Sequence, residues 1–351
     1  MKSLPAAALV AATLALGGQA GAAERVYIPL GSANAALIVD PTTDRIVGRI
    51  AGLPNVHGLA ATSDGRLLIA ASLSESAVGV AAAPAKPAGM AESDHKAHHS
   101  DAESGPQTGA VSMISFIDTA SAKIVHRIRV PGAVHHVAIT PDGRYAILTH
   151  PGTGRVSIVD VETFAVIATV PTGPAPNYAV VSPDGSRVFV SNAGNDTVSE
   201  LDPVQWTVRR TIATGEKPEH MVLSPDGRRL YVANVAGGTV SVIDTEAGSV
   251  RRTFEVGGML HGIDLSGDGG RLFVSARERG ELVAIDLPAG AVTRIPLGPA
   301  PYHAAAVRGT GKLYVSSAAE PKVWVVDQAS LRPLGEIAIT GVGHQMAVAL
   351  R

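Results

Sequence analysis

The chain has 351 residues, of which 46% are hydrophobic and 17% charged, so it has material for a large core and is not a disordered protein. Its 29 basic and 31 acidic residues give a net charge of −2, which argues against a nucleic-acid partner and an anionic membrane surface. There is no cysteine, which excludes disulfides, thiolate metal sites and c-type haem attachment. The 38 glycines and 23 prolines favour short strands joined by turns over long helices.

The first 23 residues have the pattern of a secretory signal peptide. Lys2 supplies a positive charge, residues 4–16 are apolar, and Ala20–Ala23 are small enough for cleavage. The apolar stretch is shorter than the roughly 20 residues that span a bilayer. We therefore predict that residues 1–23 are removed and that residues 24–351 form a periplasmic protein without membrane insertion.

A short apolar segment that ends in aspartate occurs seven times in the rest of the chain and marks seven units. These aspartates are Asp40, Asp118, Asp160, Asp202, Asp244, Asp286 and Asp327. After a first interval of 78 residues, they follow one another every 41 or 42 residues. A period near 42 with four short strands per unit is typical of a propeller blade. The sequence therefore predicts an all-β, seven-bladed β-propeller with four-stranded blades.

Two further features support this architecture. Tight Asp-Gly turns recur with the same period, each before a predicted strand such as Arg229–Asn234. Residues 24–50 supply three strands of a blade with no inner strand before them, whereas His344–Leu350 is an inner strand with nothing after it. Pairing these termini would complete the seventh blade and remove an exposed edge. We expect a single domain over residues 24–351.

One repeat carries a familiar motif. The segment Ser-Pro-Asp-Gly-Arg-Arg-Leu-Tyr-Val-Ala-Asn at 224–234 recurs in similar form at 182–192. It resembles the YVTN-type repeat of seven-bladed, YncE-like secreted or periplasmic propellers, with a weaker likeness to zinc-metallochaperone, lactonase and cytochrome d1-like propellers. The resemblance implies the fold; because one fold hosts many chemistries, the function has to be argued from a site.

Histidines gather where the innermost strands begin. Of 12 histidines, seven occupy these positions, where random placement would put about 0.5. They are His57, His135, His136, His220, His261, His303 and His344. Innermost strands line the channel of a propeller, so these side chains and Glu219 should converge at one mouth. Imidazole and carboxylate ligands without thiolates favour Zn²⁺ or Cu²⁺.

The register of these entrance residues stays open. Since successive strand residues alternate faces, we expect only one of each pair to point inward. One ring would contain His57, His135, Asn177, Glu219, His261, His303 and His344. In that case His136, Tyr178 and His220 would face a neighbouring blade. A purely structural role, with imidazoles bonded to loop carbonyls, is the alternative to a site.

The long first interval contains an insertion at about 76–109, which is rich in Ala, Pro, Gly and charge and is predicted to be a mobile loop. His95, His98 and His99 lie among acidic residues there, as in metal-binding tracts, although a solvated loop with incidental histidines fits as well. A connection between second and third strands lies on the entrance face, so the loop and the mouth should share one side.

We hypothesise a non-catalytic, monomeric periplasmic protein that binds Zn or Cu at the mouth and acts as a metallochaperone. Its partner would be an envelope protein or a metal-transporter component, and not nucleic acid. No nucleophile elbow, Walker loop, dinucleotide fingerprint or zinc-protease motif is present. One alternative is a cofactor-binding or enzymatic propeller that uses a mouth histidine as a haem ligand or a general base. Another is an interaction scaffold without metal.

Overall fold

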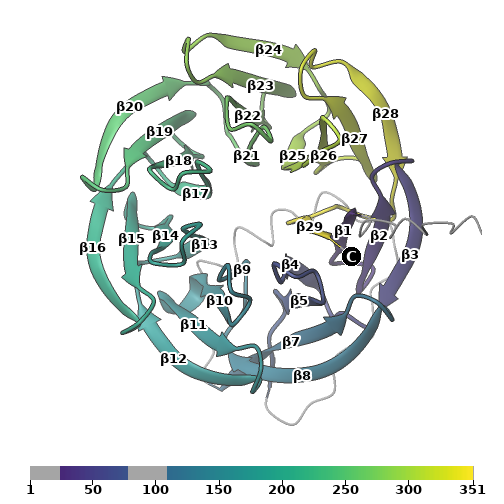
Figure 1. The fold of residues 1–351 in the computed structure, drawn as a ribbon, viewed down its shortest axis with the longest axis vertical. Coiled ribbons are helices and arrows are strands. Elements are labelled where there is room, and N and C mark those ends of the chain that lie inside the picture. Colours follow the sequence, from purple (N-terminus) through teal and green to yellow (C-terminus); the bar gives the residue numbers. More distant parts are fainter. Residues whose placement is uncertain (1–23, 78–108, 351) are drawn as a thin grey trace, which may run out of the picture.

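Short antiparallel strands build the computed structural model, which describes residues 24–77 and 109–350. The strands form seven sheets around a central axis, and each sheet is one blade of the ring (Figure 1). Six sheets have four strands, and one has a fifth, two-residue strand. The predicted seven-bladed β-propeller is thus confirmed. The described residues contain no helix with the length and hydrophobicity of a membrane span.

Within each blade, the strands lie side by side in order from the channel to the outer edge (Figure 1). Blade 1 consists of β29 (Ala347–Leu350), β1 (Glu24–Leu30), β2 (Ala35–Asp40) and β3 (Arg45–Ala51). Blade 2 consists of β4 (Val56–Ala61), β5 (Leu67–Ser72), β6 (Ser76–Ala77), β7 (Ala110–Asp118) and β8 (Lys123–Pro131). Blade 3 consists of β9 (Val137–Ile139), β10 (Tyr145–His150), β11 (Arg155–Asp160) and β12 (Ala165–Pro171).

The remaining blades repeat the same four-stranded plan. Blade 4 consists of β13 (Pro176–Val181), β14 (Val188–Asn192), β15 (Thr197–Asp202) and β16 (Thr207–Ala213). Blade 5 consists of β17 (Pro218–Leu223), β18 (Arg229–Asn234), β19 (Thr239–Asp244) and β20 (Ser249–Glu255). Blade 6 consists of β21 (Ile263–Leu265), β22 (Arg271–Ala276), β23 (Glu281–Asp286) and β24 (Val292–Pro296). Blade 7 consists of β25 (Pro301–Val307), β26 (Lys312–Ser317), β27 (Lys322–Asp327) and β28 (Pro333–Ala338).

The two ends of the described chain close the ring in blade 1. Strand β29 pairs antiparallel with β1, and Tyr27 lies opposite Ala347 in this register. Figure 1 shows the yellow β29 beside the purple β1. Closure by the terminal strands is therefore as expected, and it gives β1 a partner on both sides.

The Asp-Gly turns form as predicted from their residue types. In blade 5, Asp226 accepts a hydrogen bond from the Arg228 backbone N–H at 3.0 Å, and Gly227 adopts a φ of 68°, which costs a glycine little. The same bond recurs at Asp64, Asp142 and Asp184. These turns return each innermost strand toward the entrance face.

Apolar side chains pack between blades rather than around one centre. The buried hydrophobic residues of the described chain form seven clusters, one for each pair of neighbouring blades. Tyr231 of β18 and Leu272 of β22, for example, share the cluster between blades 5 and 6. Each blade therefore depends on both neighbours to bury its faces, and the channel is left to polar residues.

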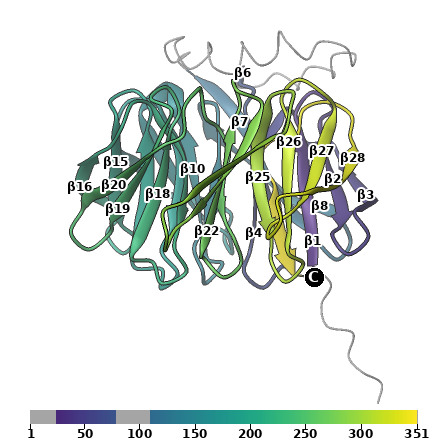
Figure 2. The same ribbon diagram turned by 90° about the horizontal axis from the view of Figure 1, so that it is seen from above.

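The strand directions place the channel mouth and the ends of the insertion on one face. In Figure 2, β6 lies at the upper face and the C-terminal end of β29 at the lower face. Strand β29 ends at the lower face, so it begins nearer the upper face. His344, which comes shortly before β29, therefore lies toward the same face as β6. The predicted signal peptide, most of the insertion, and His95, His98 and His99 lie outside the described residues.

Candidate metal centre

The seven entrance histidines meet at one end of the channel. They come from six of the seven blades, and each is between 1% and 5% exposed. His57 lies next to His135 and His344, with ring centroids 4.4 and 4.3 Å apart. His220 lies 4.3 Å from His261. Residues that are far apart in the sequence thus share one buried cluster, which we call the histidine cluster.

Contacts cross the channel as well as following its rim. His303 of blade 7 lies 5.8 Å from His136 of blade 3 and 4.9 Å from His220 of blade 5. His136 and His220 are 5.0 Å apart. The imidazoles therefore fill the mouth as one contiguous group instead of lining separate pockets.

Both members of an entrance pair belong to the cluster, which differs from the expected alternation. His135 and His136 both contact His57, with centroid distances of 4.4 and 5.1 Å. Likewise, His220 faces the channel although Glu219 also does so. The reason is an irregularity at the start of the innermost strands: the pairing shifts between Pro218 and Met221. At such a bulge the simple alternation of faces does not apply.

Hydroxyl groups on the second strands hold the entrance backbone in this shape. Thr149 Oγ1 accepts from the His136 N–H at 3.0 Å and donates to the Asn177 carbonyl at 2.8 Å. Ser191 Oγ does the same between the Tyr178 N–H, at 3.0 Å, and the Glu219 carbonyl, at 2.6 Å. Each hydroxyl links its own blade to the next. Sequence reasoning missed them, although their 42-residue spacing was a usable signal.

Backbone carbonyls determine which nitrogen of two imidazoles faces the cluster. His57 Nδ1 lies 3.0 Å from the His135 carbonyl, and His136 Nδ1 lies 2.9 Å from the Asn177 carbonyl. A carbonyl only accepts, so Nδ1–H donates in both cases and Nε2 keeps its lone pair. His136 Nε2 is buried and has no hydrogen-bond partner among the described residues. In this arrangement Nε2 is the atom of His136 that could hold a metal ion.

Burial keeps His136 neutral. It lowers the pKa of His136 well below the usual 6.5, and the neighbouring His135, His220 and His303 lower it further because their charged forms would repel. A neutral imidazole is the form that binds metal ions.

Among the described residues, Glu219 is the carboxylate that shares a possible ligand group with histidines of the cluster. It is 1% exposed, with Lys217 Nζ 3.7 Å from Oε1 and His261 Nδ1 4.0 Å from Oε2. Burial raises the pKa of Glu219, whereas the Lys217 ammonium opposes this effect. Its Oε2 accepts no hydrogen bond from the described residues. His261 is held in place by stacking on Tyr302, at a centroid distance of 3.8 Å.

Four groups of three side chains have ligand atoms within 4.8 Å of one another. They are His57, His303 and His344; His57, His135 and His136; His136, His220 and His303; and Glu219, His220 and His261. Zn²⁺ bound tetrahedrally at about 2.0–2.1 Å separates its ligand atoms by about 3.4 Å. The ligand atoms of each group would therefore have to move closer together, by up to about 1.4 Å, to share one ion.

Gln345 forms a link across the channel beside the cluster. It comes from blade 1, yet its Nε2 donates to the Val137 carbonyl of blade 3 at 3.1 Å and to the Tyr178 hydroxyl of blade 4 at 3.3 Å. Burial raises the pKa of Tyr178 to about 12, so the phenol stays protonated at neutral pH. These contacts fix the polar surroundings of the imidazoles.

Two other histidines have ordinary roles. His150 is buried near the same face, where Nδ1 lies 3.1 Å from the Ala133 carbonyl and Nε2 lies 2.8 Å from Ser157 Oγ. Both nitrogens are thus used within the fold. His126 on the outer strand β8 is exposed and stacks on Phe164, with centroids 4.1 Å apart.

Comparison with protein families agrees with the fold. Residues 175–286 match the family model of the YNCE-like beta-propeller, and they lie within the seven-bladed ring described above. Over these residues, about a third of the chain, the protein is similar to the YNCE-like beta-propeller family. A search of curated proteins gave no match to its sequence.

Several solved structures are similar to this protein in shape. The periplasmic gluconolactonase PpgL of Pseudomonas aeruginosa has a TM-score of 0.70 and 19% identity, covering 93% of this chain and 99% of that one. Kuenenia stuttgartiensis hydrazine synthase has a TM-score of 0.64 and 19% identity, covering 82% and 87%. The dihydro-heme d1 dehydrogenase NirN, solved in complex with DHE, has a TM-score of 0.65 and 15% identity, covering 92% of this chain and 65% of NirN. These identities support a shared fold only.

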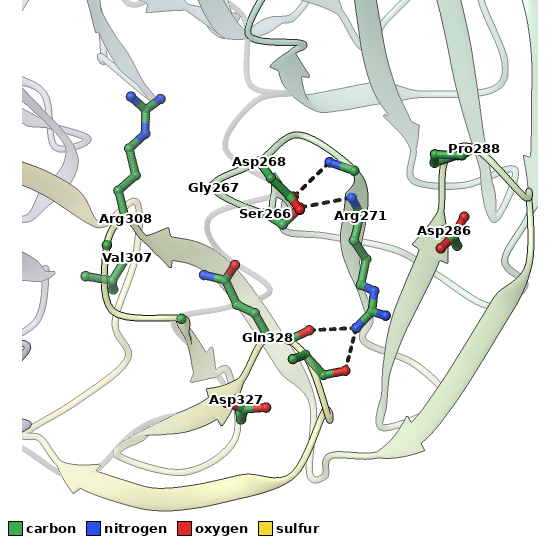
Figure 3. Close-up of a pocket in the computed structure, with 14 residues that line it drawn as sticks. Ser266, Gly267, Asp268, Arg271, Asp286, Pro288, Val307, Arg308, Asp327 and Gln328 are labelled. Atoms are coloured by element: carbon green, nitrogen blue, oxygen red, sulfur yellow. Dashed lines mark hydrogen bonds between the residues drawn. The ribbon is translucent and has the colours of Figure 1, made fainter.

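A cavity of about 550 Å³ lies among the turns of blades 6 and 7. Figure 3 shows Arg271 crossing it to the carbonyls of Gln328 and Ala329, both at 2.7 Å. The carboxylate of Asp268 bonds to its own turn, at the Gly270 N–H. The polar side chains named here thus bond to backbone groups of the turns and do not converge on a common point in the cavity.

Proposed function

We propose that the protein is a periplasmic, non-catalytic binding protein that holds a transition-metal ion in the histidine cluster. The observation that carries the proposal is the set of four ligand groups drawn from different blades. The signal-like N-terminus and the likeness to a periplasmic gluconolactonase support the location. We further propose that His95, His98 and His99 of the insertion capture or pass on the ion, as in a metallochaperone.

The donor set favours Zn²⁺ or Cu²⁺. Imidazole nitrogens are good ligands for both ions, and the absence of cysteine removes the thiolates that would select Cu⁺. The carbonyl contacts of His57 and His136 support ion binding because they hold the rings with Nε2 toward the cluster. Neighbouring imidazoles at 4.1–6.1 Å leave space for an ion between them but would have to move to admit a macrocycle.

The direct test is calorimetric titration of Zn²⁺ and Cu²⁺ into the mature chain after removal of any affinity tag. We expect submicromolar binding that weakens by about 100-fold or more when His57 and His220 are both replaced by alanine, since each of the four groups then loses a ligand. The His126→Ala variant is the matched control because His126 is exposed and distant from the mouth. Binding that survives alanine at His57, His261, His303 and His344 would overturn the proposal.

A second candidate function is a cofactor-binding or enzymatic propeller. It is favoured by the similar shape of NirN, solved with DHE, and of the gluconolactonase. A cluster histidine would then act as an axial haem ligand or as a general base. Visible absorption of protein purified from its native host tests the first case, and lactone hydrolysis in the presence of a chelator tests the second. A scaffold without metal would give neither signal.

A further inference from the structure

We propose that the histidine cluster binds two divalent transition-metal ions at once, one through imidazoles around His57 and a second, Zn²⁺, through Glu219, His220 and His261. This inference rests on the proposed metal-binding function. It assigns a separate, carboxylate-containing site to one side of the mouth.

The composition of the ligand groups allows two ions. The two groups that contain His57 use His303 and His344, or His135 and His136, as their other members. The group around Glu219 shares no residue with either of them. When an ion occupies the His57 side, a complete set of three ligands therefore remains on the other side. The fourth group takes its members from both sides and lies between them.

Glu219 is placed like a ligand rather than like a partner in an ordinary ion pair. Its Oε2 lies 4.0 Å from His261 Nδ1, too far for a hydrogen bond but close to the separation of two atoms on one ion. Lys217 approaches the other oxygen, Oε1, at 3.7 Å, so it leaves Oε2 accessible to an ion. A carboxylate that is 1% exposed needs strong compensation of its charge, which a divalent ion would provide.

The two sites differ in charge and donor type. Three imidazoles leave the full charge on the ion, whereas Glu219 neutralises part of it on the other side, which reduces repulsion between two ions in one mouth. Two imidazoles and one carboxylate match a common zinc site that keeps one position for water. A single imidazole layer separates the sites, since His220 lies 4.9 Å from His303.

The test is the number of Zn²⁺ ions bound per chain, measured by equilibrium dialysis and elemental analysis. All proteins carry H95A, H98A and H99A, so that the insertion histidines do not contribute. We expect two ions in this background, one in Glu219→Gln, one in His57→Ala, and none when His57→Ala and His220→Ala are combined, because none of the four groups is then complete. Glu162→Gln and His126→Ala, both at exposed positions, should keep two. Circular dichroism of each metal-free variant checks its fold.

The outcomes separate this inference from the proposed function. No bound ion in the background protein would overturn both, whereas a single ion would overturn only the second site. Two ions retained in Glu219→Gln would overturn the assignment of Glu219. Should Glu219→Gln fold poorly, Glu219→Asp replaces it: the carboxylate is kept but shortened, so the second ion should bind about tenfold more weakly, and unchanged affinity would count against the site.

Discussion

At the scale of single residues, the hydrogen bond made by one ring nitrogen of a histidine decides whether the other nitrogen is available as a metal ligand. His57 and His136 each donate from Nδ1 to a backbone carbonyl, which directs Nε2 toward the cluster. His150 lies near them in an equally buried position, but both of its nitrogens are used within blade 3. Burial alone therefore does not distinguish a candidate ligand from a structural histidine; the hydrogen-bond pattern does.

The buried histidines make stability depend on pH. Burial lowers the pKa of His136 well below 6.5 and that of His150 to about 4. In the unfolded chain both titrate near 6.5, so below that pH the unfolded state takes up protons that the folded state does not. The contribution of these two histidines to the stability of the metal-free protein should thus be greatest above pH 6.5 and fall as the pH drops toward 4.

Thermal unfolding of metal-free protein across this pH range measures the effect. His136→Ala should flatten the dependence, whatever its effect on absolute stability, because one of the titrating groups is gone. His126→Ala should leave the slope of the wild type. A His136→Ala variant whose melting temperature depends on pH in the same way as that of the wild type would contradict this account.

At the scale of secondary-structure elements, the innermost strands do not begin as regular strands. Pro218 pairs with Asn234 and the next pair is Met221 with Val232, so Glu219 and His220 lie in an irregular segment. The alternation of faces predicts which side chains point inward in regular strands, but it fails in this irregular segment. The reason is that the bulge depends on hydrogen bonds to another strand and to the next blade. Ser191, on β14, provides such a bond for the Glu219 carbonyl.

Removing that hydroxyl tests its role. Ser191→Ala should lower the free energy of unfolding by about 1–2 kcal/mol, because the buried Tyr178 N–H and Glu219 carbonyl lose a partner. Thr207→Ala, at an exposed position of β16, is the control and should change it by less than about 0.5 kcal/mol. Urea denaturation of the metal-free proteins gives both values, and equal values would show that the hydroxyl does not hold the entrance.

At the scale of the whole molecule, the repeat pattern predicts the ring well and the site incompletely. The periodic aspartates and Asp-Gly turns indicate the blades, and the entrance position of seven histidines indicates the cluster. Gln345 carries no local signal for its bond to Val137, which is 208 residues away. Contacts of this kind exist only once the ring has closed, so periodicity cannot reveal them.

Closure itself can be tested by truncation. Ending the chain after Gly343 removes β29 and leaves β1 without its inner partner. We expect a loss of about 1 kcal/mol for each hydrogen bond removed, and self-association through the exposed edge of β1. Thermal melts and size-exclusion chromatography measure both effects. A truncated chain that melts at the same temperature and stays monomeric would show that the terminal pairing is dispensable.

The terminal strands also give the ring a seam. It lies in blade 1, where the last strand, β29, and the first strand, β1, are joined by hydrogen bonds and not by the chain. His303, His344 and His57 lie on three consecutive blades across this seam. An ion held by these three side chains would act as a cross-link between the two ends of the polypeptide. A free metal concentration of 100 times the dissociation constant would then raise the free energy of unfolding by about 2.7 kcal/mol. This stabilisation would act at the seam, the one place where the ring is not closed by the chain itself.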